Sequence, residues 1–474
     1  MNHKQFISVD KSMLIAPAGH GKTHSITECL LHTEGKQLIL THTHAGVASI
    51  NEKIKKNKLS PQKYHVETIA GYAQKYVQAY CKKASVPDRD NTDIYYSFIL
   101  EKAKSIIASP IISHSIKTTY TGLFVDEYQD CTIKQHELIQ VLAKLLPTRI
   151  LGDPLQGIFN FGGSIPMVDL GDAAQMGGFL SNSHKLEEPW RWKGINEPLG
   201  DALKKIRADI ELKNPIDLSA YPSVEYIKIS SSSDLYNPTL PYYKSLNKLL
   251  SNRNLLIIHP ESSSIHPRKK IIASFKIPII LIESIDDKDF YKLSKIFDDV
   301  ASSTIGNAIY EVSLSLFNKV EVNKWLNNSG AKRRTGEWKS TSDALRKMFA
   351  DATVSNNFSD YANLLEFINQ IKGIRCFRKE LLRSLCSTLR ASSTSTLTVS
   401  ESMIETRNHV RKIGKKVFGR CIGTTLLTKG LEFETVVILN AHDFECPKNL
   451  YVALTRASKR LIVFSTSAIL SPKY

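Results

Sequence analysis

Short apolar runs bounded by polar loops recur along the chain, and each is typical of a strand buried in a sheet. In the N-terminal part these runs are Met13–Ala16, Gln37–Leu40, Gly122–Val125 and Thr148–Leu151. The segments between them have helical composition, and alternating strands and helices predict a parallel sheet covered on both faces. The C-terminal part repeats the pattern in the runs Val224–Ile229, Leu255–Ile258, Ile277–Ile282, Val436–Leu439 and Leu461–Phe464. The pattern therefore predicts two α/β domains.

Two stretches interrupt this alternation. Residues 73–120 are rich in Lys and Tyr, and we predict a small helical insertion there. Residues 302–403 are more polar, and the apolar positions within Tyr361–Ile368 recur with helical spacing, so a longer helical insertion is expected. The first domain is then predicted to comprise residues 1–72 and 121–190, and the second residues 191–301 and 404–474.

A glycine-containing turn lies between a strand-like run and a helical segment, Ser25–Leu31. It reads APAGHGKT over residues 16–23, with Ala16 where the first Gly of the full phosphate-loop pattern would stand. Glycines let backbone N–H groups face a phosphate, and the start of the following helix adds positive partial charge. Lys22 is suited to the β and γ phosphates, and Thr23 to Mg²⁺. The turn therefore indicates a nucleotide site.

Two adjacent acids end another apolar run, because Asp126 and Glu127 follow Leu123–Val125 directly. Phosphate hydrolysis needs one carboxylate on the metal and a second near the attacking water. An exposed turn is the commoner place for such a pair, but the preceding run is wholly apolar. We assign Asp126 to Mg²⁺ and Glu127 to the water.

Charge adds a partner to this picture. The chain has 63 Lys and Arg against 46 Asp and Glu, a formal charge of +17, which favours a polyanion such as nucleic acid. An acidic membrane surface is disfavoured because the basic clusters are scattered along the chain. Seven cysteines without a CxxC pair predict neither disulfides nor a zinc ribbon. No leader and no membrane-spanning run is recognisable, so we expect a cytoplasmic protein.

Taken in order, the motifs resemble those of the UvrD/Rep-type superfamily 1 helicases over nearly the whole chain. After the phosphate loop, the matching segments are Thr41–Gly46, Glu67–Tyr72, Asp126–Asp130, Gly152–Phe161, Leu186–Arg191, Thr424–Phe433 and Leu450–Ala457. The resemblance implies an α/β fold with two RecA-like parallel-sheet domains of the P-loop NTPase type, carrying mostly helical insertions. It also implies that ATP binds between the two domains.

The resemblance assigns roles within the nucleotide site. Gln156 would sense the γ-phosphate, and Arg191 and Arg456 would act as arginine fingers. The expected catalytic residues are Lys22, Asp126, Glu127, Gln156, Arg191 and Arg456. The expected nucleotide contacts are Gln5, Ala18, Gly19, His20, Gly21, Lys22, Thr23, His24, Trp190, Gly430 and Glu432, with Thr23 and Asp126 on Mg²⁺. Among these, Gln5 would read adenine, Trp190 would stack on it in place of the family's Tyr, and Glu432 would bind the ribose.

A strand-binding surface is implied in the same way. Its expected members are Thr43, His44, Thr68, Tyr72, Phe159, Phe161 and Thr424. By composition alone such aromatics are more often core residues, and their place in the motifs is what favours base stacking. His42 and His44 would share one face of a strand, but they lack a third ligand, so we expect no zinc site. Gly162 and Leu426 replace an Arg and a His of the family, which leaves weak or conditional coupling open.

The sequence thus predicts an ATP- and Mg²⁺-dependent motor on single-stranded DNA or a tailed or forked duplex, with 3′ to 5′ polarity implied by the resemblance. The main alternative is an ATPase that regulates a separate nuclease as part of a complex. For that alternative, the compact size resembles the UvrD-like component of Gabija-type anti-phage systems. RNA as the strand is a third alternative, since stacking and backbone contacts do not distinguish the sugar.

Overall fold

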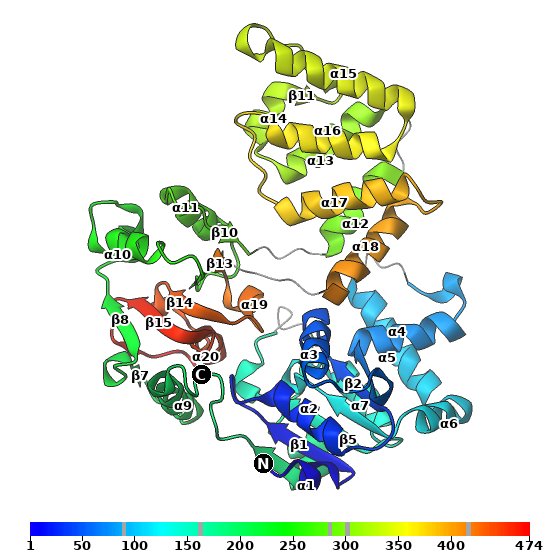
Figure 1. Ribbon diagram of the computed structural model, residues 1–474, viewed down its shortest axis with the longest axis vertical. Helices are drawn as coiled ribbons and strands as arrows, with labels where there is room; N and C mark the ends of the chain where they lie inside the picture. The colour runs from blue at the N-terminus through cyan, green and yellow to red at the C-terminus, as the bar shows by residue number, and fades with distance from the viewer. Residues whose placement is uncertain (88–91, 160–164, 283–286, 299–303, 414–418) are drawn as a thin grey trace. The chain divides into compact units, whose positions relative to one another are not determined.

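The computed structural model describes residues 1–87, 92–159, 165–282, 287–298, 304–413 and 419–474 (Figure 1). The chain divides into two compact units. The core unit comprises Met1–Ile282 and Gly414–Tyr474, and the insertion unit comprises Glu283–Ile413. The core unit holds both large sheets, and the insertion unit is mainly helical.

The first sheet has six strands, and every pairing between them is parallel. Their order is β3-β2-β4-β5-β1-β6. The bounds are β1 Lys11–Ile15, β2 Gln37–Thr41, β3 Tyr64–Thr68, β4 Gly122–Val125, β5 Thr148–Gly152 and β6 Ser183–Lys185. The accompanying helices are α1 His3–Ile7, α2 Lys22–His32, α3 His44–Lys56, α4 Ile69–Tyr80, α5 Thr92–Ile107, α6 Pro110–Thr119, α7 Ile133–Leu142 and α8 Ala173–Met176. All four strands predicted for this part are confirmed.

The second sheet also has six parallel strands, in the order β10-β13-β9-β14-β15-β8. They are β8 Val224–Lys228, β9 Leu255–Ile258, β10 Ile280–Leu281, β13 Arg420–Gly423, β14 Phe433–Ile438 and β15 Ala457–Ser465. Its helices are α9 Glu197–Glu211, α10 Pro241–Leu249, α11 His266–Ser274, α19 Thr425–Thr428 and α20 Pro447–Leu454. A small antiparallel pair joins β7 Ile216–Asp217 to β16 Ile469–Leu470. Two parallel sheets with helices confirm the predicted α/β class.

Both faces of each sheet are buried, which explains the continuous apolar runs in the sequence. In β2, Leu38 and Leu40 belong to one apolar cluster, whereas Ile39 belongs to another. In β9, Leu256 lies in one cluster and Ile257 in the next. Successive side chains point to opposite faces of a strand, so each face finds its own layer of helices.

The insertion unit has a helical core of its own. Its elements are α12 Asp287–Asp298, α13 Ile305–Leu316, α14 Lys319–Trp325, α15 Lys339–Ser355, α16 Phe358–Gln370, α17 Lys379–Ser392, α18 Val399–Ile413 and the hairpin β11 Leu326–Asn327 with β12 Gly330–Ala331. The helical spacing predicted around Tyr361 is seen in α16, where Tyr361, Leu364, Leu365 and Ile368 are all buried in this core. Among the described residues, no helix combines the length and the hydropathy that crossing a membrane requires.

His259, just after β9, gives the fold a dependence on pH. Its side chain is 7% exposed, and its Nδ1 accepts a hydrogen bond from the backbone N–H of Glu261 at 3.0 Å. Burial, with the nearby Arg268, lowers the pKa of His259 to about 4. As the pH falls below about 6.5, the imidazole of His259 therefore binds a proton in the unfolded chain before it does so in the folded chain.

We expect the free energy of unfolding to fall by about 2 kcal/mol because of His259 when the pH is lowered from 7 to 5. Above the unfolded pKa this contribution should be constant. Denaturant titrations at both pH values measure it. The loss should shrink by about that amount in His259→Gln, but not in His114→Gln, which changes an exposed histidine. Equal losses in wild type and His259→Gln would contradict the assignment.

Candidate active site

The loop between β1 and α2 has the backbone of a phosphate site. Gly19 and Gly21 have φ values of 75° and 90°, in the left-handed region that glycine adopts readily. A Cβ on Gly19 would also lie 2.6 Å from the ring of Trp192. Gly21 is the N-cap of α2 and supplies no side-chain hydrogen bond, so the first N–H groups of the helix remain for a ligand.

Lys22, the first residue of α2, meets both predicted acids. Its Nζ lies 3.0 Å from Asp126 Oδ1 and also contacts Glu127 Oε1. Burial by itself would lower the pKa of Lys22, but the two carboxylates raise it above its ordinary value. Burial raises the pKa of Asp126, whereas Lys22 and Lys429 overcome burial at Glu127 and lower its pKa to about 2. The structure thus brings the predicted loop lysine and acidic pair together.

Glu127 is held in an unusual backbone conformation. It follows Asp126 at the end of β4 with a φ of 54°, which costs a non-glycine residue energy and is seen often at functional sites. Gln129 Nε2 donates to Glu127 Oε2 at 2.5 Å, and Gln129 Oε1 accepts from the backbone N–H of Asp153 at 3.0 Å. Gln129 therefore ties the acidic turn to the loop after β5.

Gln156 lies on that loop, in the 3₁₀ turn Pro154–Gln156. It is 8% exposed, and its Nε2 donates to Asp153 Oδ2 at 2.8 Å. Sequence reasoning placed Gln156 in the site but gave Asp153 and Gln129 no role. Both stood inside matched motifs, which was the available signal.

Arg191 and Arg456, the two predicted arginine fingers, both contact Thr455 in the second half of the core unit, which is the part built around the second sheet. The backbone N–H of Arg191 donates to Gly19 O at 2.9 Å, so this segment lies against the phosphate loop. The Arg191 guanidinium pairs with Glu432 at 2.8 Å and donates to Thr455 O at 2.5 Å. Arg456 is 2% exposed, and its hydrogen bonds go to Val452 O, Leu431 O and Thr455 Oγ1. The two arginines are thus both anchored at Thr455.

Lys429 is a further site residue that the sequence reasoning left without a role. Its Nζ lies 2.6 Å from both carboxylate oxygens of Asp130 and also donates to Gln156 O. The same ammonium is 4.8 Å from the ring centroid of Phe159. Burial lowers the pKa of Lys429. Burial also raises the pKa of Asp130 to about 7. One lysine from the second half thus contacts the acidic turn, the Gln156 loop and Phe159.

The residues predicted around the base and ribose are less closely gathered. Trp190 is 54% exposed, and a Cβ on Gly21 would lie 3.4 Å from its ring, so it stands beside the loop. His24 is exposed on α2 and approaches Glu28 at 3.7 Å. Gln5 is exposed on α1, and its side chain makes no polar contact with a described residue. The position of Gln5 gives no support to adenine recognition.

The remaining residues that were predicted to contact the nucleotide lie in and near the phosphate loop and α19. Thr23 is in the first turn of α2, and His20 Nδ1 is 2.9 Å from Ala18 O. Gly430 has a φ of 80°, with open space where a Cβ would be, and the next residue but one is Glu432. Ala18 is buried in the same apolar cluster as residues of the second sheet.

Three threonines predicted to contact a strand are helix N-caps. The hydroxyl of Thr43 accepts from Gly46 N in α3, that of Thr68 from Gly71 N in α4, and that of Thr424 from Leu427 N in α19. Thr43 is exposed, whereas Thr68 and Thr424 are each 4% exposed. Their side-chain oxygens are thus already used to begin helices.

The predicted histidine and aromatic contacts differ among themselves. The expectation that His42 and His44 share a strand face is wrong, because β2 ends at Thr41 and His44 begins α3. Tyr72 is 2% exposed and bonds to Tyr76 through its hydroxyl, which supports a core role rather than base stacking. Phe159 packs 5.3 Å from the ring of His42, and Phe161 lies outside the described residues.

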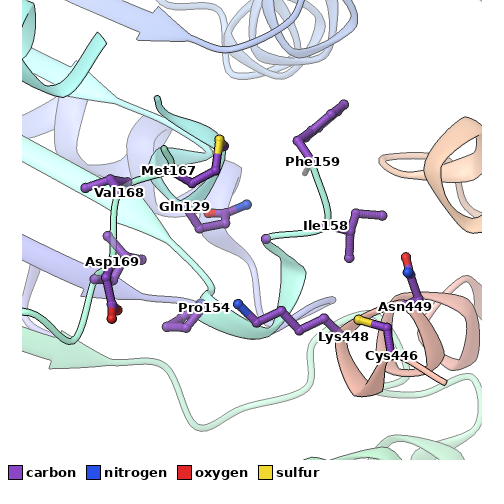
Figure 2. Close-up of a pocket in the computed structure, with 12 residues that line it drawn as sticks. Gln129, Pro154, Ile158, Phe159, Met167, Val168, Asp169, Cys446, Lys448 and Asn449 are labelled. Carbon is purple, nitrogen blue, oxygen red and sulfur yellow. The ribbon is translucent and has the colours of Figure 1, made fainter. Parts of the chain in front are cut away.

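A cavity of about 370 Å³ opens beside the Gln129 turn (Figure 2). Gln129, Pro154 and Met167 line one side, and the start of α20 lines the other with Cys446, Lys448 and Asn449 (Figure 2). Its described lining residues include none from the phosphate loop. The cavity is therefore an approach to Gln129 and is separate from the expected phosphate site.

Two parallel sheets, with a phosphate loop on the first and arginines from the second half beside it, define a P-loop NTPase fold with two RecA-like domains. The family model described as UvrD/REP helicase N-terminal domain matches residues 88–168. This match supports the resemblance to UvrD-like superfamily 1 helicases that the order of the motifs predicts.

A curated relative is an ATP-dependent helicase/nuclease subunit from Alkaliphilus metalliredigens (strain QYMF). It is 31% identical over 106 residues, which are 22% of this chain and 8% of that protein. The chain thus spans only a small part of the length of this relative. Among solved structures, the crystal structure of Pif1 helicase from Candida albicans aligns over 98% of this chain and 94% of its own, with 12% identity and a TM-score of 0.35.

Proposed function

We propose that this chain hydrolyses ATP with Mg²⁺ and uses the energy to move 3′ to 5′ along single-stranded DNA. The carrying observation is the convergence of Lys22 with Asp126 and Glu127, beside a phosphate loop that the backbone of Arg191 contacts at Gly19. The matched helicase family model supports nucleic acid as the track.

The acidic pair and Lys22 fit a phosphate and a metal together. Lys22 pairs with both carboxylates. A triphosphate on the loop would attract Lys22, and this would free Asp126 to hold Mg²⁺ with Thr23. The metal would neutralise charge on the phosphate oxygens. The donors are a hydroxyl and a carboxylate, which suit a hard cation.

Glu127 would then orient and deprotonate the attacking water. Its low pKa keeps it ionised at neutral pH, and the Gln129 amide fixes one of its oxygens. Arg191 and Arg456 would stabilise charge that develops on the transferred phosphoryl group. Gln156, held close by Asp153, would detect whether the γ-phosphate is present.

Coupling to a strand would pass through Lys429. This residue joins Asp130 in the acidic turn to the Phe159 ring, which is the predicted platform for a base. A base that displaces the Phe159 ring would therefore move the Lys429 ammonium, which pairs with Asp130 in the same turn as the proposed base Glu127. The charge of +17 would favour the phosphates of the strand.

The first measurement is steady-state ATP hydrolysis with and without single-stranded DNA. We expect the strand to raise kcat, because Lys429 joins the predicted base platform to the acidic turn. The stimulation should weaken as salt increases, because binding releases counterions from the strand. Matched RNA serves as competitor. Equal ATPase rates with and without strands would contradict the proposed motor. Stronger stimulation by RNA than by DNA would instead identify RNA as the strand along which it moves.

A further inference from the structure

A buried ion pair joins the part of the core unit around the second sheet to the part around the first sheet. Neither of its residues is among the proposed catalytic groups. Arg207, on α9, is 4% exposed, and Asp153, just after β5, is fully buried. Arg207 NH1 lies 2.8 Å from Asp153 Oδ1. The same nitrogen donates to the Tyr451 hydroxyl at 3.0 Å, and Nε pairs with Glu211 at 2.9 Å. None of the proposed chemical steps uses Arg207 or Asp153 directly.

Asp153 has a second set of contacts that leads into the site. Its Oδ2 accepts from Gln156 Nε2 at 2.8 Å, whereas its Oδ1 faces Arg207 and also accepts from Leu155 N at 3.2 Å. Its backbone N–H donates to Gln129 Oε1, and Gln129 donates to Glu127. One carboxylate therefore bridges the second half of the core unit and the side chain expected to meet the γ-phosphate.

Arg207 is carried by an element that packs with the second sheet. The apolar face of α9 includes Leu203, Ile206 and Ile210, and these lie in the same cluster as Val436 of β14. A displacement of this half would therefore move Arg207 with it. A buried carboxylate that loses its cation is strongly disfavoured, so Asp153 would reorient or take up a proton.

We propose that Arg207 is a positioning residue for ATP hydrolysis, which acts by fixing the Asp153 carboxylate so that the Gln156 amide is aimed at the γ-phosphate. Gln156 is then correctly set only while α9 is docked on the loop after β5. The proposal rests on the proposed ATPase function. Burial alone would lower the pKa of Arg207, but the ion pair with Asp153 raises it above its ordinary value.

A purely structural role for the pair makes a different kinetic prediction. If Arg207 only stabilises the fold, its loss and the loss of Gln156 act independently, and their effects on kcat multiply. If Arg207 acts through Gln156, removing Gln156 leaves Arg207 nothing further to position. A double-mutant cycle in kcat separates these two cases.

The experiment compares Arg207→Met, Gln156→Ala and the double variant in the full chain. We expect each single change to lower kcat by about 10- to 100-fold, the scale of a small misplacement in an active site. The double variant should match Gln156→Ala within about threefold, and the KM for ATP should shift less than about threefold in all three. Glu211→Gln is the matched control, since it removes only the half-exposed partner of Arg207 and should leave kcat unchanged.

Multiplicative losses in the double variant would overturn the proposal, as would a large rise in KM with an unchanged kcat. If Arg207→Met does not fold, as judged by circular dichroism, Asp153→Asn takes its place in the same cycle because it keeps the size of the side chain. A wild-type chain that hydrolyses no ATP would instead remove the proposed function itself. The two failures are therefore distinct.

Discussion

Replacing Glu127 with Gln should lower kcat for ATP hydrolysis by about 10²–10⁴-fold, the contribution typical of a positioned general base. The amide cannot accept the proton of the attacking water. ATP affinity should persist, because Lys22 keeps its 3.0 Å partner Asp126 and the loop backbone is unchanged. Single-turnover hydrolysis measures the chemical step, and binding of a fluorescent ATP analogue measures affinity.

The comparison needs a variant with the same loss of charge elsewhere. Glu137→Gln changes a partly exposed glutamate that pairs with Lys104, so its kcat should equal that of the wild type. A Glu127→Gln enzyme that retains more than about a tenth of the wild-type kcat would assign the base to another residue. Asp130, a further buried acid that pairs with a lysine near the site, would be examined next.

The two sheets were predictable because each strand in their centres is apolar on both faces. Leu38, Ile39 and Leu40 face alternate helix layers, so the whole run had to be hydrophobic. In the two large sheets, the sequence pattern did not reveal β3, β6 and β13. The central strand β13 has an apolar run of only Cys421 and Ile422, whereas the edge strands β3 and β6 lack apolar residues on both faces. β3 contains Tyr64, His65 and Glu67 at partly exposed edge positions, and β6 has no aliphatic residue. Edge strands bury less surface, so their composition is less constrained.

The site residues also fall into two groups, those set by local sequence and those set by the packing of distant segments. Lys22, Asp126 and Glu127 sit in local motifs whose backbone shape follows from nearby residues, so sequence reasoning could group them. Arg207 belongs to no motif, and its importance depends on a contact with Asp153 that only the packed chain creates. The threonine N-caps show that a residue inside a functional motif can also have a structural duty that the motif does not reveal.

If Arg456 is an arginine finger as proposed, Arg456→Gln should produce the second large effect, a fall in kcat of about 10³-fold or more. The guanidinium is 2% exposed and, within the described chain, pairs with no carboxylate. Burial and the neighbouring Arg191 lower the pKa of Arg456 to about 9, so the cation is short of negative charge until an anion arrives. The developing charge of the transferred phosphoryl group would supply that anion.

The loss in Arg456→Gln should be confined to the transition state. ADP affinity, measured by calorimetry, should change little in Arg456→Gln, since ADP lacks the γ-phosphate. Arg460→Gln is the matched control, because Arg460 lies on the neighbouring strand β15 but is exposed and paired with Glu225. Arg456→Lys keeps the charge without the planar fork and should still lose at least about tenfold in kcat. A folded Arg456→Gln enzyme with kcat within about threefold of wild type would mean that the buried cation serves the packing of α20, where it bonds to Val452, and not catalysis.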